Sequence, residues 1–463
     1  MDVLVLGAGP AGVVAALQTT RLGAQTTLAT SGAFGGMAAN DGPIPVRTLA
    51  QAARLIREAR QLGRYGIDGS HEPIDFGRLL ARVDEVVRHA RANSTLRNDL
   101  DAAGAVIHEH VGPARFVDEH AVETGEGRRF EADRIILCVG GRSRALPVPG
   151  FELTATHSDA WSLTAVPASM LVIGAGATGA QVASIFAAFG SSVQLFEAAP
   201  RILETEDEDV SSAVRAAFTA NGIAIKEGFG VVERFEAAPG GVRMVFSKEG
   251  AVHSAEAAVA VVAIGWTADT DGLGLAAAGV ETDARGHVAV DEYLCTSAPH
   301  VFAAGDVTSR CGLASLAIQD GFLAATNAVR GPTVTVGDQV VPVGSFTDPE
   351  YAHVGLTEAA ARTEHDVHVA TVSYDSAPRP IIDGRTTGFC KLVVDRPTRT
   401  ILGCHIVGER AVELAQLAAV AMIGRLTVDE LARLPLSFPT YTDVFHRSAS
   451  VAARTAGDTI VVA

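Results

Sequence analysis

Two short apolar runs in the chain are each followed directly by a glycine-rich turn and an alanine-rich stretch. The runs cover residues 3–6 and 171–173, and the alanine-rich stretches end at Gly23 and Gly190, before a second apolar run begins. This pattern predicts a buried strand, a tight turn, a helix and a second buried strand, in that order. Because the pattern occurs twice, we expect two β-α-β units in one chain.

The segments between and after these units follow other periodicities. Charged residues at helical spacing predict amphipathic helices over 46–64 and 76–91, and alternation over 105–123 predicts a small antiparallel excursion. Near the end of the chain two strands and a helix are predicted, over 389–395, 401–407 and 411–424. A hairpin followed by helices is typical of α+β structure, so the C-terminal third is expected to be a separate domain.

Both glycine-rich turns have the spacing G-x-G-x-x-G. The glycines are Gly7, Gly9 and Gly12 in the first unit and Gly174, Gly176 and Gly179 in the second. The first glycine permits the tight bend, the second lets the backbone approach a pyrophosphate, and the third lets the helix pack on the strand. The phosphates lie at the helix N-terminus, where unpaired N–H groups and the helix dipole attract anions. The strand-turn-helix context makes each turn a predicted dinucleotide site.

The last residue of the second strand indicates which nucleotide the second unit takes. That residue is Glu197, seven positions after Gly190. A carboxylate there accepts hydrogen bonds from the ribose hydroxyls and repels a 2′-phosphate. We therefore expect NADH to be preferred to NADPH.

Composition excludes several other classes of protein. Apolar residues make up 48% and charged residues 19% of the 463 positions, which suits large cores and excludes a disordered chain. The net charge of −16 argues against a nucleic-acid partner. No segment supplies the roughly 20 consecutive apolar residues of a membrane span, and the N-terminus has no basic leader. An acidic run over 204–209 is interpreted as the solvated start of a helix.

The cysteines are few and unpatterned. They are Cys138, Cys295, Cys311, Cys390 and Cys404, and no two form a C-x-x-C pair of the kind that binds metal or carries redox chemistry. No metal site is expected. Such a set suits a reducing compartment, so we expect a cytoplasmic protein.

Five further segments, taken in order, resemble the two-dinucleotide-binding flavoprotein reductases. They are 135–142, 262–275, 301–306, 346–358 and 402–408. This family includes dihydrolipoamide dehydrogenase, glutathione reductase and mercuric reductase. The resemblance implies an α/β fold with two Rossmann-like dinucleotide-binding domains, one for FAD and one for NAD, followed by a C-terminal α+β interface domain. It also implies a homodimer.

The resemblance divides the chain and assigns its cofactor residues. The FAD-binding domain would cover 1–150 and 268–335, the NAD-binding domain 151–267, and the interface or dimerisation domain 336–463. FAD would be held by Gly7, Gly9, Gly12, Thr30, Gly35, Gly36, Gly140, Asp306 and Ala314. The nicotinamide nucleotide would be held by Gly174, Gly176, Gly179, Gln181, Glu197 and Gly265. At Thr30 the family usually has a glutamate for the adenosine ribose, so FAD is expected to be held less tightly.

The chain departs from the family where the family carries its redox-active cysteines. The family segment reads G-G-T-C-x-N-x-G-C-x-P-S-K, and residues 35–47 here read GGMAANDGPIPVR. The two cysteine positions are Ala38 and Pro43, neither of which can carry electrons. The lysine position is Arg47, a cation that would favour the anionic reduced flavin.

The C-terminal motif departs in the same way. The family's H-P-T-x-S-E supplies an acid–base histidine and its glutamate partner, whereas residues 438–443 read FPTYTD. Phe438 cannot transfer a proton, and Asp443 has no histidine to orient. In the implied dimer, Phe438 and Tyr441 would complete the other subunit's pocket.

These departures predict an enzyme that passes electrons directly from flavin to an acceptor. The leading interpretation is an NADH-dependent FAD oxidoreductase acting on a small conjugated acceptor such as a quinone, with Arg47, Phe438, Tyr441 and Asp443 at the reacting centre. A soluble pyridine nucleotide transhydrogenase is the alternative, because that branch also has an aromatic residue before P-T. A non-catalytic flavin-binding redox sensor stays open as a third.

Overall fold

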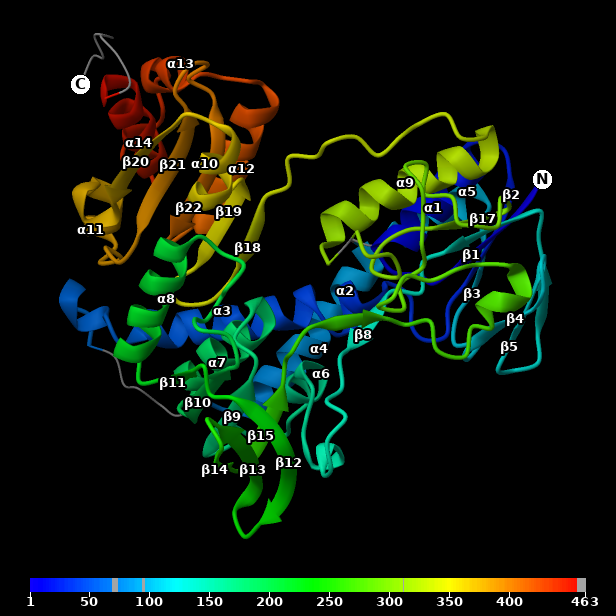
Figure 1. Ribbon diagram of the computed structural model, residues 1–463, viewed down its shortest axis with the longest axis horizontal. Coiled ribbons are helices and arrows are strands. Elements are labelled where there is room, and N and C mark those ends of the chain that lie inside the picture. The colour runs from blue at the N-terminus through cyan, green and yellow to red at the C-terminus, as the bar shows by residue number, and fades with distance from the viewer. Residues whose placement is uncertain (69–73, 94–95, 311, 456–463) are drawn as a thin grey trace.

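The computed structural model describes residues 1–68, 74–93, 96–310 and 312–455. A parallel five-stranded sheet forms the N-terminal unit, in the order β17-β7-β1-β2-β3. Its strands are β1 (Asp2–Leu6), β2 (Gln25–Ala29), β3 (Val106–His108), β7 (Arg134–Leu137) and β17 (Val301–Ala303). Helix α1 (Pro10–Arg21) packs on it together with α5 (Arg97–Ala103) and α9 (Ala314–Arg330). Residues 301–303 thus return to the sheet that residues 2–6 begin (Figure 1).

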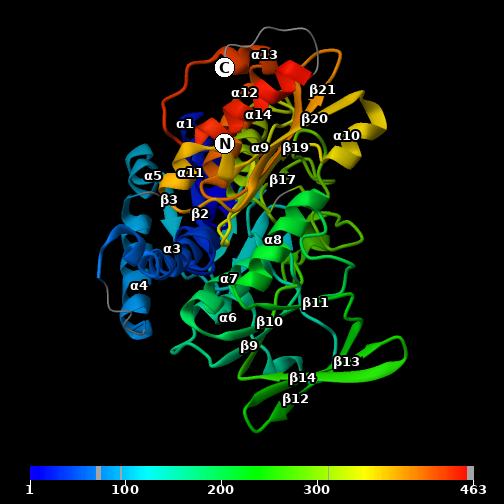
Figure 2. The same cartoon turned by 90° about the vertical axis from the view of Figure 1, so that its left-hand side faces the viewer.

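The second unit repeats this plan. Its parallel sheet has the order β11-β10-β9-β15, with α7 (Ala177–Phe189) between β9 and β10. The strands are β9 (Ser169–Ile173), β10 (Ser192–Glu197), β11 (Ala224–Glu227) and β15 (Val259–Val262). An antiparallel sheet of β12 (Val231–Ala238), β13 (Gly241–Lys248) and β14 (Ala251–Ala257) projects from this unit, at the end opposite the C-terminal helices (Figure 2).

The two units are joined by a crossing of two short strands. Strand β8 (Gly141–Ser143) leaves the first sheet, and β16 (Trp266–Ala268) returns from the second. They pair antiparallel, with Trp266 opposite Ser143. After β8 the chain enters α6 (His157–Trp161), which packs against α7.

An antiparallel five-stranded sheet forms the C-terminal unit, in the order β18-β19-β22-β21-β20. Its strands are β18 (Val343–Ser345), β19 (Tyr351–Gly355), β20 (Val367–Ser373), β21 (Phe389–Asp395) and β22 (Ile401–Val407). Its helices are α10 (Glu358–Glu364), α11 (Pro378–Ile382), α12 (Ala411–Ile423), α13 (Val428–Arg433) and α14 (Thr442–Thr455). The predicted fold class, two Rossmann-like units followed by an α+β unit, is confirmed.

Helix α3 (Pro43–Ala59) ties the three units together. It follows the short helix α2 (Gly36–Asn40) and packs against α4 (Phe76–Asn93) and α7. Its apolar residues share one core with residues of α7 and of the C-terminal sheet. Its Arg54 and Arg57 pair at 2.7 Å with Glu409 and Asp348 of the C-terminal unit. Helix α3 therefore fixes residues 35–47, the segment that carries the cysteine pair in the family, against both the second unit and the C-terminal unit.

The antiparallel excursion is present as β4 (Ala114–Asp118), β5 (Ala121–Thr124) and β6 (Arg129–Glu131). In the described residues, no helix is long and apolar enough to cross a bilayer. The predicted helix over 46–64 differs at both ends, since α3 begins at Pro43 and stops at Ala59. Proline is tolerated in a first helical turn because its missing N–H has no partner there.

The acidic run over 204–209 begins a helix, α8 (Glu208–Ala220), as predicted, and Glu204, Glu208 and Asp209 are exposed, but two of its carboxylates are not solvated. Asp207 is 5% exposed and its carboxylate accepts a hydrogen bond from Lys391 Nζ at 3.0 Å. Glu206 is buried as well and lies 2.7 Å from His353 Nδ1. These pairs join the second unit to the C-terminal sheet.

Candidate functional site

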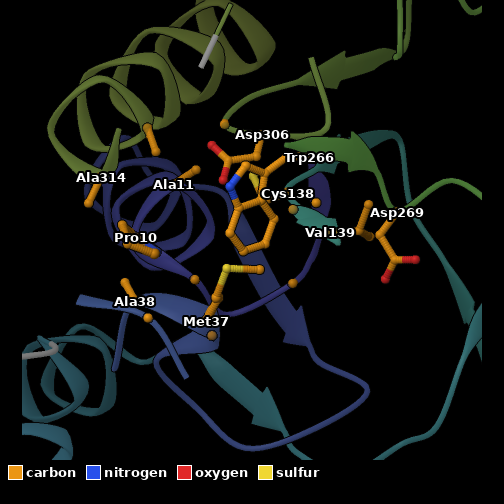
Figure 3. A pocket seen from close by; sticks show the side chains of 18 of the residues that line it. Pro10, Ala11, Met37, Ala38, Cys138, Val139, Trp266, Asp269, Asp306 and Ala314 are labelled. Atoms are coloured by element: carbon orange, nitrogen blue, oxygen red, sulfur yellow. The ribbon is translucent and has the colours of Figure 1, made fainter. Parts of the chain in front are cut away.

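A cavity of about 1220 Å³ runs between the first unit and the crossing strands. The N-termini of α1, α7 and α9 all line it, at Pro10, Ala177 and Ala314. Helix N-termini attract anions, so the cavity suits phosphate-bearing ligands. In Figure 3, Pro10, Ala38 and Ala314 lie along one side of the cavity, and the Trp266 indole faces the Met37 thioether beside Asp306.

Gly7 and Gly12 of the first motif, and Gly36 beside it, leave no room for a side chain, whereas a Cβ on Gly9 would meet only Gly36 Cα, at 4.0 Å. A Cβ atom on Gly12 would lie 1.8 Å from the carbonyl oxygen of Gly7, and one on Gly36 would lie 2.5 Å from Gly9 Cα. Gly36 also has a φ of 56°, in the left-handed region. No side chain caps the first turn of α1. Its free N–H groups and the close backbone approach form the cradle that a pyrophosphate requires.

The second glycine motif meets the same cavity at Ala177 and Thr178, whereas Gly174, Gly176, Gly179 and Glu197 do not line it. A Cβ on Gly179 would lie 1.8 Å from the carbonyl oxygen of Gly174, so this turn is equally tight. Glu197 accepts a hydrogen bond from the backbone N–H of Ala175 at 2.7 Å, which holds its carboxylate beside the turn. Thr178 and Gln181 of α7 line the cavity that the first motif lines. Two dinucleotide motifs therefore converge on one space.

The other predicted cofactor residues are distributed around this space. Those that line the cavity are Gly7, Gly9, Thr30, Gly36, Gly140, Asp306 and Ala314. Burial raises the pKa of the Asp306 carboxyl. Gly35 has a φ of 95° and precedes α2, and Gly265, with a φ of 107°, precedes Trp266. Gly35 and Gly265 do not line the cavity, and neither does Gly12.

The departures from the family motif lie in the cavity wall. Met37, Ala38 and Pro43 line it, and so does Arg47. Burial lowers the pKa of Arg47 to about 10, and the carboxylates of Glu350 and Glu413 oppose part of that shift. The Arg47 guanidinium lies over the Phe346 ring.

The predicted C-terminal residues lie elsewhere in the chain's own structure. Phe438 is 70% exposed, and none of Phe438, Tyr441 and Asp443 lines the cavity described here. Tyr441 donates to Asp383 Oδ2 at 2.9 Å, and Asp443 pairs with Arg447 at 2.7 Å. The single chain therefore does not bring these three residues to the cavity.

One described thiol lies in the cavity wall, that of Cys138. It is 5% exposed, and burial raises its pKa far above the usual thiol range. Cys295, Cys390 and Cys404 are free and do not line the cavity. Cys311 lies outside the described residues.

Sequence analysis did not single out Asp41, His157, Trp161 and Trp266, which line the cavity. The chain has only two tryptophans and both are in this set. Asp41 and Trp266 stand inside quoted motif segments, which was a usable signal. His157 and Trp161 come from a five-residue helix with no motif, so nothing in the sequence pointed to them.

Comparisons with known proteins agree with this architecture. Residues 1–321 match the pyridine nucleotide-disulphide oxidoreductase family, and residues 341–449 match the dimerisation domain of that family. A dihydrolipoyl dehydrogenase of Zymomonas mobilis is 32% identical over 459 residues, which cover 97% of each chain. A mercuric reductase of Bacillus cereus is 32% identical over 434 residues, covering 93% of this chain and 68% of its own.

Solved structures agree as well. The HOCl-induced flavoprotein disulfide reductase RclA from Escherichia coli superposes with a TM-score of 0.86 at 25% identity, covering 97% of this chain and 100% of that chain. With its two nucleotide motifs on one cavity and a dimerisation domain behind them, the chain belongs to the pyridine nucleotide-disulphide oxidoreductase family, whose members use FAD and NAD(P)H.

Proposed function

We propose that this protein is an NADH-dependent FAD oxidoreductase that passes electrons from flavin directly to a small conjugated acceptor, such as a quinone. The observation that carries the proposal is the composition of the cavity wall. Both nucleotide motifs open onto the cavity, yet Ala38 and Pro43 stand where the family has its cysteine pair. The side chains of alanine and proline cannot be oxidised and reduced as a cysteine pair can, so no disulfide relay can form at these positions.

The residues present fit FAD. The cradle formed by Gly7, Gly9, Gly12 and Gly36 would hold the pyrophosphate at the α1 N-terminus, with Thr30 at the adenosine ribose. Gly35, Gly140, Asp306 and Ala314 would hold the ribityl chain and the ring. When bound, FAD supplies a carrier that takes two electrons and releases them singly or together.

The second motif would hold the nicotinamide nucleotide. Gly174, Gly176 and Gly179 would take the pyrophosphate, Glu197 the adenosine ribose, and Gln181 and Gly265 the end nearest the flavin. Arg47, a cation in the cavity wall, would favour the anionic reduced flavin. The domain boundaries given above, including the discontinuous FAD-binding domain of 1–150 and 268–335, are part of this proposal.

We expect the acceptor to bind against the apolar and aromatic part of the cavity wall. In one chain Met37, Ala38, Trp161 and Trp266 belong to that part, and the same wall also carries Asp41, Arg47 and His157. In a dimer, Phe438 and Tyr441 of the partner subunit would close the cavity. Flat apolar molecules gain by stacking on such side chains and need few polar contacts. A quinone fits this wall better than a charged disulfide substrate does, and the sparse cysteines suit work in the reducing cytoplasm.

An acceptor panel tests the proposal. The FAD-loaded protein is mixed with NADH under nitrogen and with menadione, NADP⁺, lipoamide or glutathione disulfide. We expect turnover with menadione and none with either disulfide. Lipoamide turnover by contaminant-free protein would contradict the proposal. Reduction of NADP⁺ alone would favour a transhydrogenase, and no bleaching of the flavin by NADH would favour a non-catalytic sensor.

A further inference from the structure

A hydrogen-bonded group of side chains surrounds His157 at the cavity wall. His157 is the first residue of α6 and is 4% exposed. Its Nδ1 lies 2.8 Å from Ser143 Oγ of β8, and its Nε2 lies 3.3 Å from Ser158 Oγ. Its ring meets the Trp266 ring edge-on, with the ring centroids 4.5 Å apart. His157, Trp266 and Asp41 all line the cavity.

This group connects the cavity to solvent. Ser158 Oγ donates to Asp41 Oδ2 while that carboxylate is ionised; once Asp41 is protonated, the Ser158 hydroxyl can turn and donate to His157 Nε2. The Asp41 side chain is 37% exposed, and its Oδ2 also lies 4.0 Å from His157 Nε2. A proton that reaches Asp41 from water therefore has a path of two short transfers to the His157 ring.

Asp41 comes from the segment between α2 and α3, two residues before Pro43. The carboxylate of this group thus comes from the segment that lacks the family's cysteine pair. Its histidine and serine side chains come from the crossing between the nucleotide units. The acid–base histidine of the family is Phe438 here, so the usual proton donor is absent from this chain.

Reduction of a quinone needs a proton that NADH does not bring. The reaction converts two C=O groups to two C–OH groups and consumes two electrons and two protons. NADH supplies both electrons and one proton as a hydride, and the second proton comes from water. A titratable side chain in the cavity wall can carry this proton from water to the acceptor.

We propose that His157 relays this second proton to the acceptor, along the path Asp41–Ser158–His157. The inference rests on the proposed function. In this step Nε2 takes a proton from Ser158 Oγ, and the proton on Nδ1 leaves through Ser143 Oγ toward the acceptor, so the ring is neutral before and after the transfer.

The charges around His157 suit a relay. Burial lowers its pKa, and the carboxylates of Asp41 and Asp159 oppose part of that effect. Asp159 lies on the same helix, where its carboxylate is bound by the Thr156 N–H at 2.7 Å. A histidine that is neutral at pH 7 can accept a proton and then pass it on, because it does not stay protonated. His287 also lines the cavity, but its carboxylate neighbour, Asp283 at 3.5 Å, belongs to its own turn.

Two acceptors separate proton transfer from electron transfer in the test. Menadione takes protons on reduction, and ferricyanide takes one electron and no proton. In His157→Gln we expect the ratio of menadione to ferricyanide turnover to fall at least tenfold, and the solvent deuterium isotope effect on menadione turnover to change. Asp41→Asn is expected to lower the same ratio about threefold or more. The matched control is His353→Gln, which removes a histidine that is bound to Glu206 and does not line the cavity, and it should leave the ratio as it is.

A second readout does not depend on turnover. Ring signals of labelled histidine should show His157 titrating in the FAD-loaded protein, with a pKa that falls in Asp41→Asn. An unchanged ratio in His157→Gln, an equal loss in His287→Gln, or a His157 ring that does not titrate would each overturn the relay. Wild-type protein that reduces ferricyanide but no quinone would instead overturn the proposed function, and the relay with it.

Discussion

The Glu197 carboxylate is held by the backbone N–H groups of Ala175 and Ala199, at 2.7 and 2.9 Å. A 2′-phosphate bound beside it would meet a fixed negative charge, which costs on the order of 1–3 kcal/mol. We therefore predict that NADH reduces the flavin at least roughly tenfold faster than NADPH at equal subsaturating concentrations.

The variant Glu197→Gln keeps an oxygen for the Ala175 N–H and removes the charge, so the ratio of the two rates should fall. The control is Glu249→Gln, at the exposed turn between β13 and β14, which should retain the wild-type ratio of the two rates. Stopped-flow measurement of flavin bleaching gives both rates. Equal rates for the two nucleotides in the wild-type protein would show that Glu197 does not face the ribose.

Glu350 gives a second prediction at the residue scale. Burial raises its pKa to about 7, and the carboxylates of Glu409 and Glu413 add to the shift. The folded state therefore favours the protonated form. Stability from this group is fully present below the ordinary pKa, near 4.5, and is lost as the pH rises through 7.

Glutamine does not ionise, so the Glu350→Gln variant does not lose this stability as the pH rises. Relative to wild type, the variant's free energy of unfolding should improve by roughly 2 kcal/mol between pH 4.5 and 8. Urea unfolding at several pH values measures this difference. If the difference between variant and wild type stays constant over that range, Glu350 does not titrate as described.

At the scale of elements, the contact between the first glycine turn and the start of α2 fixes the FAD cradle. Ala at position 36 would bring its Cβ to 2.5 Å from Gly9 Cα and would have to adopt a φ of 56°. We predict that Gly36→Ala lowers the FAD-to-protein ratio at least fivefold. Gly63→Ala, where a Cβ would meet nothing within 4 Å, should purify with the wild-type FAD content. The ratio of flavin to protein absorbance is the measurement.

The elements show how far the sequence could lead. Strands β21 and β22 have the predicted bounds, because apolar runs and the polar turn between them, at 396–400, are local signals. The glycine motifs are local as well, so both strand-turn-helix units could be located. Asp207 of the acidic run was misread because its partner, Lys391, lies 184 residues away in the chain. His157 and Trp266 meet only through the crossing of β8 and β16, which no local pattern encodes.

At the scale of the whole molecule, the C-terminal unit has an uncovered apolar surface. Val420 and Ile423 of α12 are 64% and 68% exposed, and Phe438 is 70% exposed. The dimerisation domain matches this region. We predict a homodimer of about twice 47.9 kDa by light scattering at micromolar concentration.

The variant Ile423→Asp should shift this mass toward the monomer, because a charge would enter an apolar interface. The matched control is Val231→Asp, because Val231 is 69% exposed on the antiparallel sheet of β12, β13 and β14. This variant should leave the mass unchanged. Dissociation should also lower quinone turnover, because Phe438 and Tyr441 of the partner subunit would no longer close the cavity. A wild-type protein that is monomeric and keeps full quinone turnover would contradict both the predicted homodimer and the closure of the cavity by the partner subunit.

The most direct test of electron transfer without a thiol relay is an anaerobic titration of the FAD-loaded protein with NADH, followed by its absorbance spectrum. Ala38 and Pro43 provide no thiolate to pair with oxidised flavin. One equivalent of NADH per flavin should therefore bleach the flavin fully, with no long-wavelength band, and added menadione should restore the oxidised spectrum. A long-wavelength thiolate–flavin band at the two-electron stage, or reoxidation by lipoamide, would contradict the account.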